Sequence, residues 1–197
     1  MRAAATLWLL LALPVLGGCA LTSKGTPIEI RYFSPESIDV HHVARQPPPP
    51  VARLRLGGLT SSANLRLAIV HRESAVEVDQ YDTLKWTENP EDYVRRSLSR
   101  ALFEDGQLEE VVGGVAVTLD VEVISFEASR RENRRVGRIR LGYQLHDERS
   151  VLTSGVVTVE RDAVSGGIEQ VVAAIGTAME AATSELAKNV VTKLRAR

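Results

Sequence analysis

The chain has 197 residues, of which 44% are hydrophobic and 25% are charged, as in a globular protein with one core. The formal net charge of −1 provides no general basic field, so we expect no nucleic-acid partner. The single cysteine, Cys19, excludes a disulfide within one chain, so the packed core has to hold the fold.

The N-terminal residues, MRAAATLWLLLALPVLGGCA, have the pattern of a secretion signal. Arg2 provides a positive start. The apolar run over 7–16 is about half the length of a membrane-spanning helix. Small residues and Cys19 follow this run. We interpret 1–18 as a cleaved lipoprotein signal peptide and 19–27 as a short tether.

The tetrapeptide Leu16-Gly17-Gly18-Cys19 resembles the lipobox of bacterial lipoproteins. In a lipobox the cysteine thiol takes a diacylglyceryl group, and cleavage between Gly18 and Cys19 frees an amine for an N-acyl chain such as palmitate. Two or three acyl chains give lasting membrane anchorage. By resemblance to known lipoprotein sorting, a residue other than aspartate after the cysteine, here Ala20, points to the periplasmic face of the outer membrane, with the inner membrane as the alternative. A signal peptide with a chance cysteine is the competing interpretation.

The segment after the tether predicts short strands. Ile28 to Phe33 alternates, with an apolar set of Ile28, Ile30 and Tyr32. The proline-rich residues 34–50 predict a stiff connector. Three further strands, of which the first ends at Gly57-Gly58 and the other two form a hairpin, are predicted over 51–56, 65–71 and 75–80.

An amphipathic helix of about 15 residues is predicted from Pro90 onward. Asn89 suits the N-cap, and Pro90 suits the first helical position. Gly106 stands where a left-handed C-cap would end the helix. The apolar stripe of this helix comprises Tyr93, Val94, Leu98, Ala101 and Leu102.

Residues 115–161 predict an antiparallel meander of three strands. The first strand, 115–128, alternates until Val123-Ile124, where the phase flips and predicts a β-bulge. The second and third strands are predicted over 138–145 and 151–161, and Gly155 marks a possible further bulge.

A long helix is predicted over 168–195, because apolar residues recur there at spacings of three and four. One apolar face of that length needs a broad sheet to cover it. We therefore predict an α+β fold after the signal peptide. It consists of an antiparallel-rich β-sheet of about six or seven strands with two helices packed on one face, in a single domain over 28–197.

The stretch from the predicted hairpin over 65–80 to the helix predicted from Pro90 onward resembles a known family. The hairpin is followed by Tyr81, Trp86, Pro90 and the amphipathic helix, as in the ABC-type transport auxiliary lipoproteins. The segment Arg31-Tyr32-Phe33 resembles the first strand of that family. The resemblance covers nearly the whole mature chain. It departs from the pattern at Thr-Glu-Asn before Pro90 and in the proline-rich insertion.

The resemblance implies a partner protein that is not an enzyme. Family members act beside ABC transporters whose substrate-binding subunits carry MCE domains, in systems that move phospholipid or other hydrophobic molecules between the two membranes. The implied role is to dock the periplasmic MCE component at the outer membrane, with the ABC permease and ATPase as further partners. The resemblance also allows a homo-oligomer, because the MCE partner is itself typically a ring. Two alternatives stay open: a direct lipid carrier, which requires an enclosed apolar cavity, and an envelope-assembly lipoprotein unrelated to an ABC system.

Two sets of residues are candidate contact sites. Guanidinium groups bind phosphate bidentately, so clustered arginines predict contact with lipid headgroups or an acidic partner, with a solvated turn as the alternative. This arginine cluster comprises Arg130, Arg131, Arg134, Arg135 and Arg138. The motif residues Tyr81, Trp86 and Pro90 predict either a core plug at the helix entrance or an aromatic anchor for a partner.

The sequence predicts no metal site, no cofactor other than the covalent lipid, and no catalytic residue. The histidines lack metal-ligand spacing to cysteine or carboxylates, and no motif pairs a nucleophile with a base. The four histidines are His41, His42, His71 and His146.

Overall fold

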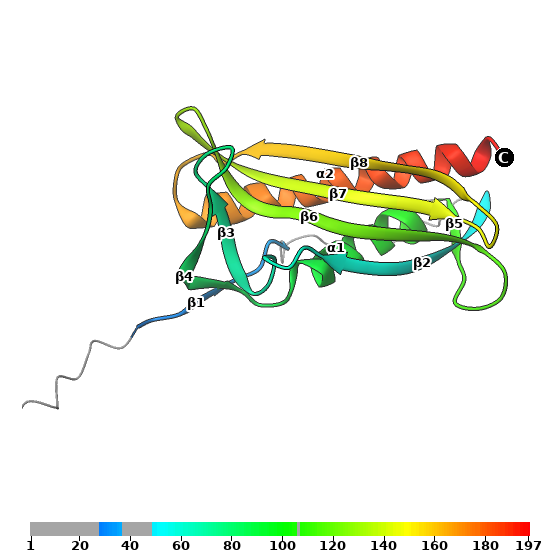
Figure 1. The fold of residues 1–197 in the computed structure, drawn as a ribbon, viewed down its shortest axis with the longest axis horizontal. Coiled ribbons are helices and arrows are strands. Elements are labelled where there is room, and N and C mark those ends of the chain that lie inside the picture. The colour runs from blue at the N-terminus through cyan, green and yellow to red at the C-terminus, as the bar shows by residue number, and fades with distance from the viewer. Residues whose placement is uncertain (1–27, 37–48, 106) are drawn as a thin grey trace, which may run out of the picture.

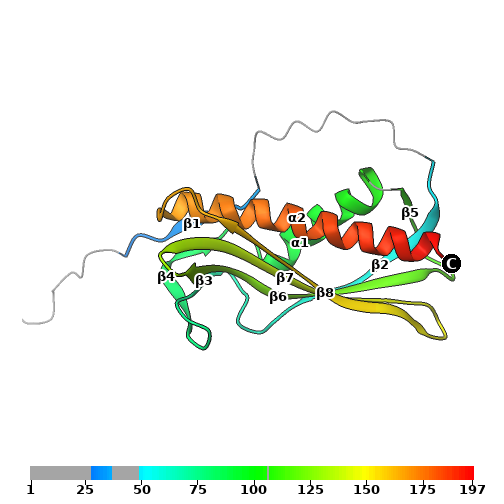
Figure 2. The same ribbon diagram turned by 90° about the horizontal axis from the view of Figure 1, so that it is seen from above.

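The computed structural model describes residues 28–36, 49–105 and 107–197. The predicted signal peptide, the lipobox with Gly18 and Cys19, and the predicted helix end at Gly106 lie outside these residues. Two α-helices cover one face of an eight-stranded sheet (Figures 1 and 2). The predicted α+β class is confirmed, with eight strands in place of about six or seven.

The long C-terminal helix has the bounds that its periodicity predicts, and the predicted three-stranded meander is also present. In chain order the elements are β1 (Arg31–Phe33), β2 (Ala52–Ser61), β3 (Ala68–Arg72), β4 (Val78–Trp86), α1 (Pro90–Ser99), the π-helix η1 (Arg100–Glu104), β5 (Leu108–Glu110), β6 (Val117–Arg131), β7 (Arg134–His146), β8 (Val151–Asp162) and α2 (Ile168–Arg195).

The sheet is built around β6. On one side β6 pairs antiparallel with β7, and β7 pairs antiparallel with β8. On its other side the first half of β6 pairs parallel with β2, and the second half pairs parallel with β3. Strand β5 extends the β2 branch, while β4 and then β1 extend the β3 branch. The sheet therefore forks and is mixed, and its two longest ladders are antiparallel.

The bulge predicted near Val123-Ile124 is confirmed, because the β6–β7 register shifts between Val123 and Ser125. The shift keeps Phe126 and Ala128 on the buried face after Leu119, Val121 and Val123. Ile124 lies instead on the outer face of the sheet, where it lines a hollow. The extra residue thus lets one long strand follow the curve of the sheet and still cover the core.

Strand β2 does not end at Gly57-Gly58 as predicted but runs through the pair to Ser61. Its register against β6 shifts between Leu56 and Leu59. A Cβ on Gly57 would lie 2.3 Å from Oδ1 of Asp120, and the N–H of Gly58 donates to that oxygen at 2.7 Å. The glycines therefore form a bulge that receives a carboxylate, which is why they do not stop the strand.

Two other local predictions need correction, and one strand was missed. The bulge proposed at Gly155 is wrong, because the β7–β8 register shifts between Leu145 and His146. Gly155 instead leaves room for the ring of Tyr143, whose nearest atoms would lie 3.0 Å from an added Cβ. Strand β4 continues to Trp86, well beyond the predicted end at residue 80, and β5 was not predicted at all.

Helix α1 begins at Pro90 as predicted. Asn89 has the extended backbone of an N-cap, although its side chain makes no capping hydrogen bond; its carbonyl accepts the N–H of Asp92 at 3.0 Å. After Ser99 the helix widens into η1, so the predicted single α-helix is divided into two types of turn.

Helix α2 runs along the whole sheet and would be roughly 42 Å long at 1.5 Å per residue (Figure 2). It packs on β7 and β8, while α1 packs on β2 and on α2 itself. Two glycines mark close approaches between this helix and its neighbours. A Cβ on Gly137 of β7 would lie 2.3 Å from the backbone nitrogen of Ile175, and a Cβ on Gly176 would lie 2.1 Å from the carbonyl of Pro35. The helix is thus held between the sheet and the segment after β1.

Candidate functional site

Trp86 of the sequence motif lies in the core. Its side chain is 1% exposed, and its ring contacts those of Phe126 and Tyr93, with centroids 5.3 and 6.3 Å away. The Tyr93 hydroxyl hydrogen-bonds with the Thr87 hydroxyl at 2.6 Å, which ties the helix to the end of β4. Pro90 is buried as well. Both residues serve the fold at the helix entrance, and neither offers a partner an exposed surface here.

Tyr81 has a different environment. It lies half-buried on β4, with its ring centroid 4.5 Å from that of His71, and its hydroxyl contacts the guanidinium of Arg135. The structure thus brings one residue of the sequence motif against one residue of the arginine cluster.

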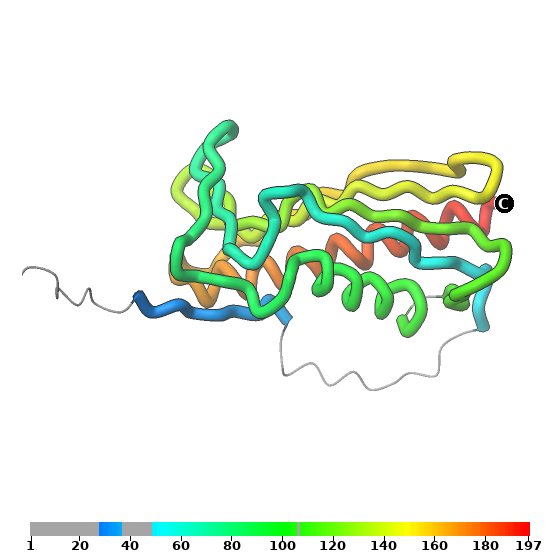
Figure 3. Tube along the Cα trace, turned by 60° about the horizontal axis from the view of Figure 1, so that its bottom comes forward, coloured from blue at the N-terminus to red at the C-terminus, as the bar shows by residue number. Residues whose placement is uncertain are grey.

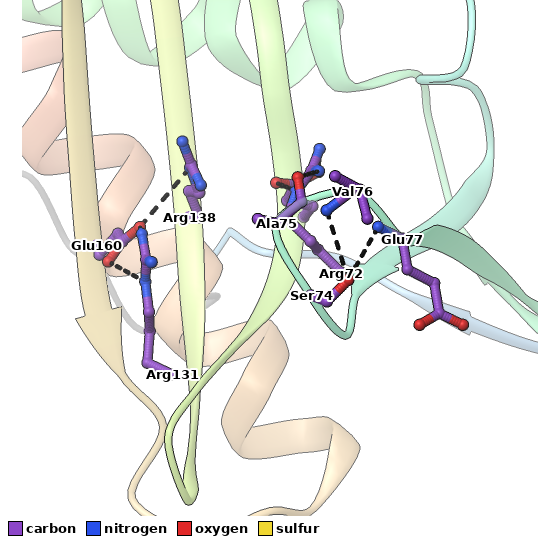
Figure 4. Close-up of polar contacts among 9 residues, drawn as sticks. Arg72, Ser74, Ala75, Val76, Glu77, Arg131, Arg138 and Glu160 are labelled. Atoms are coloured by element: carbon purple, nitrogen blue, oxygen red, sulfur yellow. Dashed lines mark hydrogen bonds and ion pairs between the residues drawn. The ribbon is translucent and has the colours of Figure 1, made fainter.

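Every member of the arginine cluster faces a carboxylate. Arg131 and Arg138 converge on Glu160 of β8, as Figure 4 shows, and Arg134 lies 2.7 Å from Asp162. Arg130 and Arg135 both approach Glu73 in the β3–β4 turn, at 3.4 and 3.5 Å. The five arginines share three carboxylates and leave an excess of two positive charges.

These ion pairs hold the β6–β7 hairpin against its neighbours. The hydrogen bond from Arg131 lowers the pKa of the Glu160 carboxyl, and the same bond raises the pKa of the Arg131 guanidinium. A phosphate would have to compete with carboxylates already in place. Contact with lipid headgroups or an acidic partner therefore remains a prediction. The sequence could not reveal this pairing, because Glu73 in the β3–β4 turn and Glu160 on β8 are distant from the arginines in the chain.

A buried ion pair lies beside this cluster. Glu127 of β6 is 1% exposed and accepts a hydrogen bond at 2.8 Å from Nε of Arg72 on β3. The second half of β6 is buried on both faces, as the burial of Ser125 and Ser129 also shows. The uncharged residues around Glu127 are the one signal in the sequence that could have suggested this burial.

The outer face of the sheet, opposite the helices, has an open hollow of about 650 Å³. Three glycines widen this hollow, Gly58, Gly142 and Gly155, and Ile124 and Val156 supply apolar walls. At its margin Nε2 of His146 lies 2.9 Å from Oδ2 of Asp120, and Nδ1 lies 3.3 Å from the carbonyl of Asp147. Both ring nitrogens of His146 therefore face oxygen atoms of this chain.

Two further observations apply to the described part of the chain alone. Across residues 28–36, 49–105 and 107–197, no three His, Cys, Asp or Glu side chains gather as metal ligands would. Within the same residues, no helix combines the length and apolarity that crossing a membrane requires.

The sequence matches the family model of the ABC-type transport auxiliary lipoprotein component over residues 46–187. The chain belongs to this family. The matched range includes Tyr81, Trp86, Pro90 and all of the arginine cluster, so the predicted family is confirmed; the segment 31–33 lies before this range. The family is an auxiliary lipoprotein component of ABC-type transport.

Solved structures of bacterial proteins show the same fold. Protein XCC0632 of Xanthomonas campestris, assigned to family DUF330, superposes with a TM-score of 0.69 at 21% identity, covering 83% of this chain and 96% of its own. The hypothetical protein CT253 of Chlamydia trachomatis has a TM-score of 0.54 at 8% identity, covering 74% of this chain and 99% of its own. These identities support the fold alone. No curated protein matches the chain.

Proposed function

We propose that this chain is a non-catalytic, lipid-anchored subunit of an ABC/MCE-type system that moves phospholipid between the inner and outer membranes. In this role it docks the periplasmic MCE component at the outer membrane and works with the ABC permease and ATPase. The observation that carries the proposal is the family match over residues 46–187. The lipobox at Cys19 supports the anchor, and the fold supplies a rigid body for docking.

The packing of the domain favours docking over carriage of lipid. A direct carrier needs an enclosed apolar cavity, and the natural place for one is between the sheet and the long helix. There α2 lies directly on β7, because the backbone of Ile175 occupies the space beside Gly137. The hollow on the opposite face is open to solvent.

The proposed membrane anchor depends on acylation of one residue, Cys19. In the proposed mature protein Cys19 carries diacylglycerol and an N-acyl chain, and residues 19–27 link it to the domain. Two or three acyl chains hold a protein on a membrane for long periods, whereas one chain gives marginal binding.

A native pull-down of the full-length lipidated protein from gently solubilised membranes tests the role. We expect an MCE-domain protein, an ABC permease and an ATPase to co-purify, identified by mass spectrometry of proteins and lipids. A Cys19→Ala variant is the matched control, and it should leave the membrane fraction. Recovery of stoichiometric phospholipid with no transporter would overturn the docking role in favour of a carrier. Recovery of outer-membrane assembly proteins alone would favour the envelope-assembly alternative.

Which of the two membranes holds the protein is tested by separating inner and outer membranes on a density gradient. We expect the wild-type chain in the outer-membrane fraction, because Ala20 follows the lipidated cysteine. An Ala20→Asp variant provides the control for sorting. Wild-type protein in the inner-membrane fraction would contradict this part of the proposal.

A further inference from the structure

The segment 28–33, of which only the last three residues form strand β1, exposes the side that its sequence pattern would bury. Residues 28–33 alternate, and Ile28, Ile30 and Tyr32 share one face. That face points away from the protein: the three residues are 78%, 49% and 62% exposed. We name this set the β1 stripe. Single exposed apolar residues are common, but three on one face of one segment form a patch that calls for a partner.

On the opposite face of the segment, Arg31 and Phe33 contact the rest of the chain, whereas Glu29 is exposed. The guanidinium of Arg31 lies 2.7 Å from Glu169 at the start of α2 and 5.0 Å from the ring centroid of Phe33. Phe33 packs against the core. The segment therefore directs Arg31 and Phe33 toward the fold and the β1 stripe outward, so burial of the stripe needs an occupant outside the described domain.

The position of the stripe points to that occupant. Strand β1 lies at the end of the β3 branch of the sheet and pairs only with β4 among the described strands. Its start projects from the end of the molecule opposite the C-terminus (Figures 1 and 3). The tether between Cys19 and Ile28 is nine residues long and spans at most about 30 Å when fully extended. The stripe is thus the first part of the domain that the anchored chain reaches.

We propose that the β1 stripe is a second membrane contact, at which Ile28, Ile30 and Tyr32 rest in the interfacial layer of a phospholipid bilayer. Tyrosine suits this layer, because its ring is apolar and its hydroxyl stays hydrated. The contact fixes the orientation of the domain, so that the end carrying the C-terminus points away from the membrane. This inference rests on the proposed lipidation of Cys19.

A site-specific fluorophore can test the contact, because the acylated mature chain has no free thiol. Cysteine is introduced by Ile30→Cys, labelled with nitrobenzoxadiazole, and the lipidated protein is reconstituted in vesicles of phosphatidylethanolamine and phosphatidylglycerol. Glu29→Cys is the matched control, since it is exposed, equally close to the anchor and on the other face. Val112→Cys, at a residue that is 92% exposed in the β5–β6 loop, controls for the far end.

We expect blue-shifted emission and quenching by nitroxide lipids at Ile30→Cys, much weaker quenching at Glu29→Cys and none at Val112→Cys. A blue shift at Ile30→Cys without lipid quenching would mean that protein covers the stripe, either another segment of this chain or a second copy, and would overturn the inference. Equal quenching at Ile30→Cys and Glu29→Cys would also overturn it, because no face would then be selected.

Intact-mass spectrometry of the mature protein distinguishes failure of the proposed Cys19 lipidation from failure of the membrane contact at the β1 stripe. If the mature protein lacks acyl chains, the proposed anchor fails and the second contact fails with it. If the acyl chains are present and the Ile30→Cys label stays in water, only the β1 stripe is overturned. As a second measurement, an Ile28→Ser/Tyr32→Ser background should abolish the quenching at Ile30→Cys while the protein remains on the vesicles.

Discussion

Strand β6 and the segment that contains β1 have the same kind of sequence pattern, but the apolar residues of β6 are buried and those of the β1 segment are exposed. Both alternate apolar with polar residues, yet β6 buries Leu119, Val121 and Val123, whereas the segment of β1 exposes Ile28, Ile30 and Tyr32. The difference lies in their places in the sheet. Strand β6 is central and covered by the helices, while β1 lies at the end of a branch. Alternation thus indicates a strand, but only topology decides which face is covered.

The largest effect is expected at the centre of β6. Phe126→Ala should lower the free energy of unfolding by about 3–5 kcal/mol, because it empties a fully buried site against Trp86 and Tyr93. Urea denaturation followed by circular dichroism measures this loss. Phe126→Leu keeps most of the volume and should lose clearly less. An equally mild effect of both variants would mean that the aromatic cluster does not hold β6 to α1.

The second largest loss of stability is expected at the buried carboxylate of β6, Glu127. Glu127→Ala leaves the Arg72 guanidinium without its partner and should cost about 3 kcal/mol of unfolding free energy, at the low end for a buried pair because Arg72 is partly hydrated. The same urea titration applies. Glu127→Gln retains the shape and one acceptor and should recover part of the loss. If Glu127→Ala proved neutral, the burial of β6 on both faces would not depend on this pair.

The contact between β7 and α2 can be broken without changing any polar group. Gly137→Ala places a methyl group 2.3 Å from the backbone of α2, so the helix has to shift, and we expect a loss of about 1–3 kcal/mol. The melting temperature and the denaturation midpoint should both fall. Gly113→Ala, in a loop where an added Cβ meets nothing within 4 Å, is the control and should behave as wild type.

The β7–β8 turn is also exposed, but unlike the β1 stripe it has partners within the chain. The carboxylate of Asp147 accepts hydrogen bonds from the turn and from Arg197. Backbone N–H groups of Arg149 and Ser150, together with Arg197, lower the pKa of the Asp147 carboxyl from 3.8 to about 2. A lowered folded-state pKa gives stability that is present above the ordinary value and is lost as the pH falls toward the folded one.

Wild-type stability should therefore decline between roughly pH 5 and pH 2 with a contribution that Asp147→Asn lacks. Thermal unfolding of both proteins across this range gives the comparison. The difference between them should be greatest at the upper end and should shrink as the carboxyl is protonated. A constant difference would contradict the assigned cause.

The smallest effect is expected on the β1 stripe itself. Tyr32→Ser should change the free energy of unfolding by no more than about 0.5 kcal/mol, because the side chain contacts solvent and not the core. Phe33→Ser, one residue further along and packed against the core, is the matched control and should destabilise the protein. A large loss for Tyr32→Ser would mean that the stripe serves the fold.

The sequence predicted best what depends on local periodicity. Helix α2 has one apolar face over its whole length, so its bounds agree with the prediction. The bulge in β6 was likewise visible as a phase flip. Strand β5 was missed because three residues are too few to show a period, and the parallel pairing of β2 and β3 with β6 depends on contacts between segments distant in the chain.

The candidate sites were predictable only in part, for the same reason. The arginines stand out in the sequence, but their partners Glu73, Glu160 and Asp162 are brought in by neighbouring strands and turns. The burial of Trp86 depends on Phe126, a residue 40 positions away in the chain. The exposure of the β1 stripe could not be foreseen, since a lone alternating segment does not reveal which of its faces meets the fold.

The contact between Pro35 and Gly176 has a mechanical meaning for an anchored protein. In the proposed mature chain, a pull on the membrane anchor enters the domain at Ile28 and runs along β1. Its hydrogen bonds to β4 cross the strand axis, so a pull along that axis loads all of them together in shear and does not open them one by one. Just beyond β1, the backbone of Pro35 lies against Gly176 in the first third of α2. Tension from the membrane is thus transferred to the longest helix of the domain.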